Sequence, residues 1–169
     1  TAPRRCLDLV NSKPVTFDGV DFTCGIFGLT KTGSGALTLL NCGILHNYQC
    51  SGETYWRDDI VSWYSDSAFR RPNDCGHGCG LRIKAPSADV VVSNCVIAGN
   101  IADHSYRNES AGILAWGVKS LTVADTLIAS NGLNWALGSA PGNGHRGRGT
   151  AISLRNAPAT FTRCRILGH

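Results

Sequence analysis

The sequence contains no methionine, no long apolar run and no segment with a convincing helical period. A membrane-spanning helix needs about 20 predominantly apolar residues in succession, and no stretch of this chain approaches that length. No secretory signal is present at Thr1. These absences predict a soluble β-rich chain that is either processed or cut from a longer protein.

The usual signatures of nucleic-acid binding are also missing. The net charge is +4, but there is no long basic helix, no RNP-like aromatic motif and no zinc-finger spacing. Basic residues cluster at Arg4-Arg5, at Arg70-Arg71, between His145 and Arg148, and at Arg163 and Arg165. Such clusters suit either a solvated surface or an acidic polysaccharide, so we expect no nucleic-acid partner.

What the chain does have is enough apolar sequence for one globular domain and many cysteines. It has 169 residues, of which 43% are apolar and 17% charged. Its eight cysteines include no repeated CxxC pair, a pattern that favours disulfides in an oxidising compartment over cytosolic zinc. We therefore expect an extracellular or cell-surface location, where Asn108 would begin a usable glycosylation sequon.

A short phrase recurs five times along the chain. Each copy begins with alternating, often β-branched residues, bends at Asn, Asp or Gly, and then alternates again, which indicates a strand, a sharp turn and a second strand. Another short strand, expected to open on Gly80, Gly112 or Gly149, precedes three of the copies. The copies are residues 15–25, 37–47, 90–100, 121–131 and 159–169.

Three short strands per repeat make one triangular coil, which buries little apolar surface by itself. Successive coils must therefore stack like positions on one another. The sequence predicts an all-β parallel β-helix of about five coils with two aliphatic ladders inside. The expected ladders consist of Phe17, Leu39, Val92, Val123 and Phe161, and of Phe22, Ile44, Ile97, Ile128 and Ile166.

Asparagine ends three copies, at Asn47, Asn100 and Asn131. Asparagine tolerates left-handed backbone, and its amide can hydrogen-bond the corner above or below, so we expect these residues to be structural.

A second recurring position holds Cys42, Cys95 and Cys164, with Thr126 and Val20 in the other copies. A small, half-buried residue fits there. Packing as thiols and a disulfide between neighbouring coils both remain open at this position.

The repeats resemble the right-handed parallel β-helix of the pectin-lyase-like superfold. More narrowly, they resemble the repeats of chlamydial-type polymorphic outer membrane proteins, which carry Gly-Gly-Ala-Ile and Phe-x-x-Asn. The matches are Gly149-Thr-Ala-Ile152, Ala111-Gly-Ile113, and Ile-x-x-Asn at 44–47, 97–100 and 128–131. The resemblance covers residues 15–169 and implies the fold, whereas a fold of this kind does not specify an activity.

The residues between copies fall at one corner of the expected coil. We expect residues 1–14 to form an N-terminal cap and 15–169 the β-helix, with the longest insertion at 48–79. Aromatic residues and arginines in these loops suit contact with sugar rings or another protein. The candidate binding residues are Tyr55, Trp56, Arg57, Arg70, Arg71, His77, Tyr106, Trp135, His145, Arg146 and Arg148.

The longest insertion ends on the motif CGHGC, residues 75–79. A disulfide from Cys50 to Cys75 or Cys79 would close this loop, and Cys6 is expected to pair with Cys24. The motif offers a metal at most three crowded ligands in an oxidising compartment. We therefore expect no metal and no other cofactor.

An enzymatic alternative rests on fragments that resemble polygalacturonases. Those enzymes carry a paired aspartate, a Gly-His-Gly and an Arg-Ile-Lys, matched here by Asp58-Asp59, Gly76-His77-Gly78 and 82–84. Paired carboxylates can divide the general-acid and water-activating roles. In that family, however, the motifs occupy successive coils, whereas the last two fall here within nine residues and Asn-Thr-Asp is missing.

The leading hypothesis is therefore a non-enzymatic, extracellular structural or adhesive segment of a larger protein that binds through its loop-rich corner. The alternative is a carbohydrate-active or carbohydrate-binding β-helix. Because the fifth copy reaches His169 without residues for a cap, we expect further coils or another chain to stack there. An acidic polysaccharide is the other expected partner.

Overall fold

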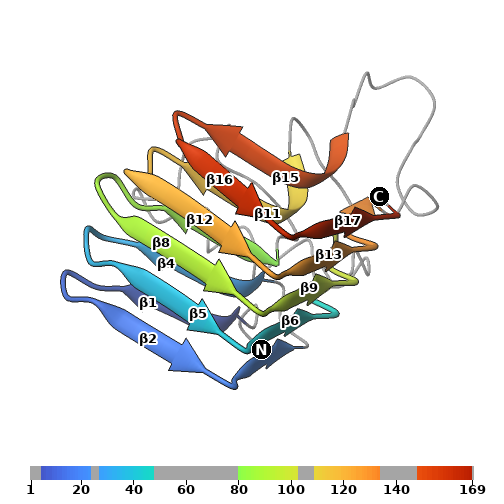
Figure 1. Ribbon diagram of the computed structural model, residues 1–169, viewed down its shortest axis with the longest axis horizontal. Coiled ribbons are helices and arrows are strands. Elements are labelled where there is room, and N and C mark those ends of the chain that lie inside the picture. The colour runs from blue at the N-terminus through green and yellow to red at the C-terminus, as the bar shows by residue number, and fades with distance from the viewer. Residues whose placement is uncertain (1–4, 24–26, 48–79, 103–108, 134–147, 169) are drawn as a thin grey trace, which may run out of the picture.

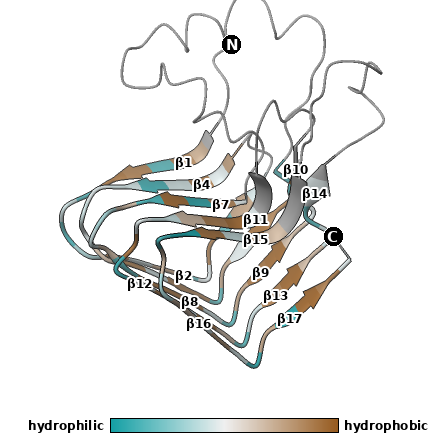
Figure 2. Cartoon of the chain, turned by 90° about the horizontal axis from the view of Figure 1, so that it is seen from above, coloured by the Kyte–Doolittle hydropathy of each residue, from teal (hydrophilic) through white to brown (hydrophobic). Residues whose placement is uncertain are grey.

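The protein is a stack of parallel β-coils. The computed structural model describes residues 5–23, 27–47, 80–102, 109–133 and 148–168. Their regular structure consists of strands, arranged in three parallel sheets of five strands each and one additional pair of short strands (Figure 1). Seen from above, the three sheets form the sides of a triangle (Figure 2). The predicted parallel β-helix of about five coils is confirmed.

Each coil contributes one strand to each sheet, in chain order. The first sheet contains β1 (Arg5–Val10), β4 (Phe27–Thr32), β7 (Leu81–Lys84), β11 (Glu109–Trp116) and β15 (Arg148–Arg155). The second sheet contains β2 (Val15–Asp18), β5 (Leu37–Leu40), β8 (Asp89–Ser93), β12 (Ser120–Ala124) and β16 (Ala159–Thr162). The third sheet contains β3 (Asp21–Thr23), β6 (Gly43–Leu45), β9 (Val96–Ala98), β13 (Leu127–Ala129) and β17 (Arg165–Leu167).

Both predicted aliphatic ladders are confirmed by the strand register. In the second sheet, Leu39 pairs with Phe17 on one side and with Val92 on the other. In the third sheet, Ile97 lies between Ile44 and Ile128. The inward members on the three middle coils are completely buried, so the core runs continuously through the stack.

The corner between the second and third sheets is a one-residue bend in left-handed backbone. This conformation suits Gly, Asn and Asp, which is why these residues interrupt the alternation. The bend residues are Gly19, Asn41, Asn94, Asp125 and Arg163, whose φ angles lie between 51° and 67°.

The prediction of left-handed backbone at the three asparagines that end the copies was wrong. The residue before each of them takes this conformation instead, at His46, Gly99 and Ser130. The asparagine then continues in ordinary backbone with its side chain buried. The left-handed residue turns the chain, and the asparagine fills the space inside that turn.

A strand that the sequence pattern did not indicate completes the second coil. The sequence pattern predicts that the nine residues between Gly25 and Gly35 are inserted, but β4 occupies six of them and pairs with β1 and β7. Its alternation is interrupted by Lys31, an inward-facing charged residue, which explains why the pattern was hard to recognise.

The expected alignment of the three glycines that open the first-sheet strands holds for two of them. Leu81 pairs with Ile113, so that Gly80 lies beside Gly112. Gly149, in contrast, pairs with Ser110. Ala151 occupies the corresponding position of the fifth coil, because Ile113 pairs with Ile152.

The description of the chain is interrupted at the same step of four coils. Residues 24–26, 48–79, 103–108 and 134–147 all connect a coil's third-sheet side to the first-sheet strand of the next coil. Before two of these connections, β10 (Ile101–Ala102) pairs with β14 (Gly132–Leu133). Residues 1–14, expected to be a cap, contribute β1 to the first sheet, while their role as a cap stays a prediction.

Candidate functional site

Most of the predicted site residues lie outside the part of the chain that the structure describes. The strand β15 begins at Arg148, although the side chain of this residue is not described. Cys6 is described, in β1. The others outside the described ranges are Cys24, Cys50, Tyr55, Trp56, Arg57, Asp58, Asp59, Arg70, Arg71, Cys75, His77, Cys79, Tyr106, Asn108, Trp135, His145 and Arg146.

The corner from which these loops leave is held by a buried asparagine ladder. The Asn47 side-chain Nδ2 donates to Asn100 Oδ1 at 2.9 Å, and Asn100 Nδ2 donates to Asn131 Oδ1 at 2.7 Å. Asn100 Nδ2 also donates to the carbonyl of Ile44 on the preceding coil, at 2.9 Å. The predicted structural role of the asparagines is confirmed, and the ladder gives the loop corner a rigid base.

Glycines make room for this ladder on the neighbouring strands of the first sheet. A Cβ atom on Gly80 would lie 2.6 Å from Asn100 Nδ2, and one on Gly112 would lie 2.7 Å from Asn131 Nδ2. Both distances are too short for non-bonded atoms. Glycine and asparagine are thus two halves of one packing unit.

The thiol of Cys6 closes the first end of the asparagine ladder. Its sulfur lies 3.3 Å from Asn47 Oδ1 and 2.9 Å from the carbonyl oxygen of Thr23. Because Cys24 is outside the described residues, its disulfide with Cys6 stays a prediction.

The recurring cysteine position is occupied by packed thiols. Cys42, Cys95 and Cys164 are free, and the amide of Cys42 donates to the sulfur of Cys95 at 3.4 Å. At the next coil Thr126 occupies this position, and its hydroxyl oxygen accepts a hydrogen bond from the amide of Cys95 at 3.3 Å. Burial raises the pKa of the Cys95 thiol, so this residue is a poor nucleophile.

The outer face of the first sheet carries a row of cations around a tryptophan. Trp116 pairs in register with Lys84 on one side and with Arg155 on the other. Lys84 Nζ lies 4.8 Å from the ring centroid, and Arg155 Cζ lies 5.5 Å from it. Arg82 lies over the ring of Phe27 in the same sheet. Lys84 and Arg155 therefore lie on the two coils that flank the Trp116 coil, roughly 10 Å apart, which is two strand spacings.

A lysine is buried inside the coil, in the ladder between Leu9 and Ile83. The Lys31 side chain is only 1% exposed, and its Nζ donates to the carbonyls of Thr32 and Gly33, each at 2.8 Å. Burial lowers the pKa of Lys31, since the charged form loses its hydration. No acidic residue is adjacent to Lys31 in the sequence, so the sequence did not indicate that this side chain is buried.

Lys31→Met is expected to stabilise the fold at pH 7, on the order of 1 kcal/mol, because it removes a buried charge from an aliphatic ladder. The unfolded chain holds the Lys31 proton to higher pH, so wild-type stability rises as the pH increases from the lowered folded pKa towards 10.5. The advantage of the variant should shrink over that window. Urea unfolding at pH 7 and pH 10 measures both effects.

The exposed Lys13 provides the matched control, because Lys13→Met should show no such difference between the two pH values. A Lys31→Met protein less stable than wild type at pH 7 would mean that the two carbonyl hydrogen bonds outweigh the cost of burying the charge.

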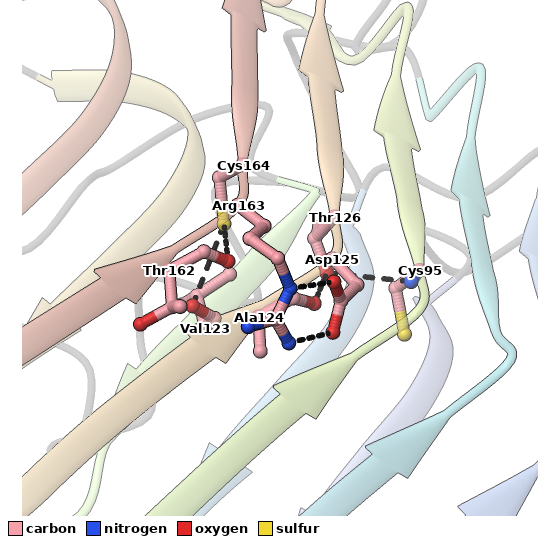
Figure 3. A network of polar contacts seen from close by, with 8 residues as sticks. All are labelled: Cys95, Val123, Ala124, Asp125, Thr126, Thr162, Arg163 and Cys164. Carbon is pink, nitrogen blue, oxygen red and sulfur yellow. Dashed lines mark hydrogen bonds and ion pairs between the residues drawn. The ribbon is translucent and has the colours of Figure 1, made fainter.

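The described carboxylates that show a pKa shift are surface groups in hydrogen bonds. Arg163 binds Asp125 through two parallel contacts of 2.6 and 2.7 Å, which lower the pKa of Asp125 (Figure 3). The Ser120 hydroxyl, followed by Lys119, lowers the pKa of Asp89. A general acid requires a raised pKa, so these two groups are suited to holding the coils together rather than to proton transfer. Among the described side chains, no three potential metal ligands form a group.

The two ends of the stack expose parts of the core ladders. Ile128 is fully buried, whereas Ile166, the next member of the same ladder, is 47% exposed. Leu154, which continues an inward row of the first sheet, is 40% exposed. At the other end, Phe17 is partly buried and packs edge to face on Phe22, with ring centroids 5.4 Å apart. Apolar surface is thus available at the fifth coil in particular.

Comparison of the chain with models of known families, with curated proteins and with solved structures finds no match. Within the described ranges, no helix is long and apolar enough to span a membrane.

Proposed function

We propose that this chain is a non-enzymatic structural solenoid that works by association through the ends of its stack. The observation that supports this most strongly is the contrast along one ladder, from complete burial of Ile128 to 47% exposure of Ile166. A parallel strand at the edge of a sheet also has an unpaired row of backbone donors and acceptors. One further coil would cover the apolar side chains and pair the backbone of all three edge strands.

The relation of the chain to known β-helix families and its cellular location are further parts of the same proposal. The confirmed coil register, with its Ile-x-x-Asn corners, supports kinship with pectin-lyase-like β-helices and with polymorphic outer membrane protein repeats. An extracellular or cell-surface location and an adhesive role are supported by the disulfides expected among Cys6, Cys24, Cys50, Cys75 and Cys79, whereas the free thiols Cys42, Cys95 and Cys164 do not bear on the compartment. Further binding through the loop corner is part of this proposal, and the asparagine ladder would provide its rigid support.

Carbohydrate binding is the second candidate function. It is favoured by the outer face of the first sheet, where Lys84 and Arg155 flank Trp116 on neighbouring coils. Two cations on either side of an aromatic ring suit contact with an acidic polysaccharide. The catalytic form of this hypothesis would depend on Asp58, Asp59 and His77.

Sedimentation velocity over a range of protein concentrations tests the proposed association. We expect the mean sedimentation coefficient to increase with concentration, because end-on contact buries apolar surface and pairs free strand edges. The increase should persist in high salt, since the apolar contact is not screened. A cooperatively folded chain that stays monomeric at high concentration would contradict the proposal.

A further inference from the structure

We infer that the partner at these ends is a second copy of the same chain, stacked head to tail so that its first coil continues the fifth coil of its neighbour. This inference rests on the proposed function and specifies its partner. It follows from the register of the coils, from the shape of the two ends and from their opposite charges.

The register carries across such a joint without a break. Every sheet is parallel and adds strands in chain order, so β1, β2 and β3 of a second copy have the direction required to pair with β15, β16 and β17. Phe161 would meet Phe17 of the second copy, because both belong to one ladder. Ile166 would similarly meet Phe22.

Side-chain size at the two ends suits this contact. The second-sheet ladder consists of Leu and Val on the middle coils but ends in Phe17 and Phe161. Each phenylalanine is only partly buried, although it packs against the core. Stacked coils about 4.8 Å apart would bring the two rings into contact and remove both from water.

The charges at the two ends are complementary. The described side chains of the first coil include Asp8, Asp18 and Asp21, with Lys13 as the opposing charge. The described charged side chains of the fifth coil are Arg155, Arg163 and Arg165, of which Arg163 already forms an ion pair with Asp125 of the fourth coil.

One opposite pair falls at the same ladder position. Asp21 and Arg165 both begin the third-sheet strand of their coil, and the register connects them through Gly43, Val96 and Leu127. Both side chains are exposed, and neither has an ion pair among the described contacts. A head-to-tail joint would place Arg165 beside Asp21 of the next copy, one strand spacing away.

Joining the first coil to the fifth makes the contact heterologous, because two different surfaces meet. Each added copy leaves one free end of each kind, so assembly continues as an open series. Association through the outer face of the third sheet, where Val96 is 39% exposed, would instead be isologous and would stop at a dimer. The size distribution therefore separates the two arrangements.

Charge exchange between the ends tests the inference directly. We expect wild type to form an open series of dimers, trimers and larger species. Arg165→Asp and Asp21→Arg should each weaken the association at least about tenfold, because each places like charges at the joint. An equimolar mixture of the two variants should regain it, since every joint in an alternating chain then has opposite charges.

Lys119→Asp is the charge control for Arg165→Asp, because it makes the same change in net charge at an exposed residue just before β12, away from both ends of the stack. It also removes the ion pair with Asp89, so its folding is checked first. It should associate like wild type. Sedimentation velocity at low ionic strength gives the dissociation constants, and circular dichroism confirms that each variant is folded.

Two results would overturn the head-to-tail contact between copies while leaving end association intact. In the first, the wild-type protein associates but neither single substitution weakens the association. In the second, the mixture of the two variants fails to regain the association. Growth that stops at a dimer would also overturn that contact. A wild type that does not associate at all would remove the proposed function together with this inference.

Discussion

Asn100→Ala is expected to lower the free energy of unfolding by about 3–5 kcal/mol, because it removes the central rung of the buried asparagine ladder. Asn100 is completely buried, and its amide joins three coils. Its loss would leave the carbonyl of Ile44 without this donor. It would also leave the Asn47 side chain and main-chain amide without their acceptor, which lies 2.9 and 3.2 Å away. Urea unfolding followed by circular dichroism measures the change.

Asn94→Ala is the matched control for that experiment. Asn94 also donates its side-chain amide to an asparagine of the preceding coil, Asn41, at 2.6 Å, but it is exposed. Water can replace this hydrogen bond, so the cost should stay near 1 kcal/mol, chiefly from the left-handed backbone. Equal losses in the two variants would refute the structural importance of burying the ladder.

Gly80→Ala is expected to destabilise the fold by about 3 kcal/mol or more, through overpacking at the same corner. The added Cβ would lie 2.6 Å from Asn100 Nδ2 and 2.9 Å from the carbonyl oxygen of Gly112. The second contact is with backbone, so no side-chain rotation relieves it. Thermal and urea unfolding should both show the loss.

Gly132→Ala tests whether glycine replacement alone explains such a loss. A Cβ on Gly132 meets nothing within 4 Å, and the residue lies in β14 next to the ladder residue Asn131. We expect its stability to remain within about 0.5 kcal/mol of wild type. A Gly80→Ala protein as stable as Gly132→Ala would show that the corner is loosely packed.

The second and third sheets could be predicted because their inward residues repeat in one pattern. Alternation places Val92 and Ile97 inward on either side of a left-handed Asn94, and the same spacing recurs in every coil. A strict period of two leaves little freedom of register when one face is buried. Sequence periodicity was therefore sufficient for both ladders.

The first sheet was harder to predict because its strands break the simple pattern. Lys31 stands at an inward position of β4, and Gly28 and Gly80 replace side chains where asparagine amides need space. These features depend on contacts between coils, which no single repeat reveals. The sequence pattern did place the buried residues Leu81, Ile83 and Ile113 of this sheet on strands, but it did not indicate the strand that holds Lys31.

The candidate site could be predicted only in part. The sequence predicted that further coils or another chain stack on the fifth copy, and Ile166 of that coil is exposed. The opposite charges at Asp21 and Arg165 emerged only when the register placed them in one ladder. The loop residues singled out in the sequence belong to no repeat, so periodicity gave them no position.

Hydrogen exchange of the wild-type chain at low and high protein concentration tests the central claim most directly. Association through the ends predicts that amides of β3 and β17 gain protection together at high concentration, while those of β8 in the middle of the stack do not change. Unchanged exchange at β3 and β17, with new protection confined to residues 48–79, would contradict end association and would locate binding at the loop corner.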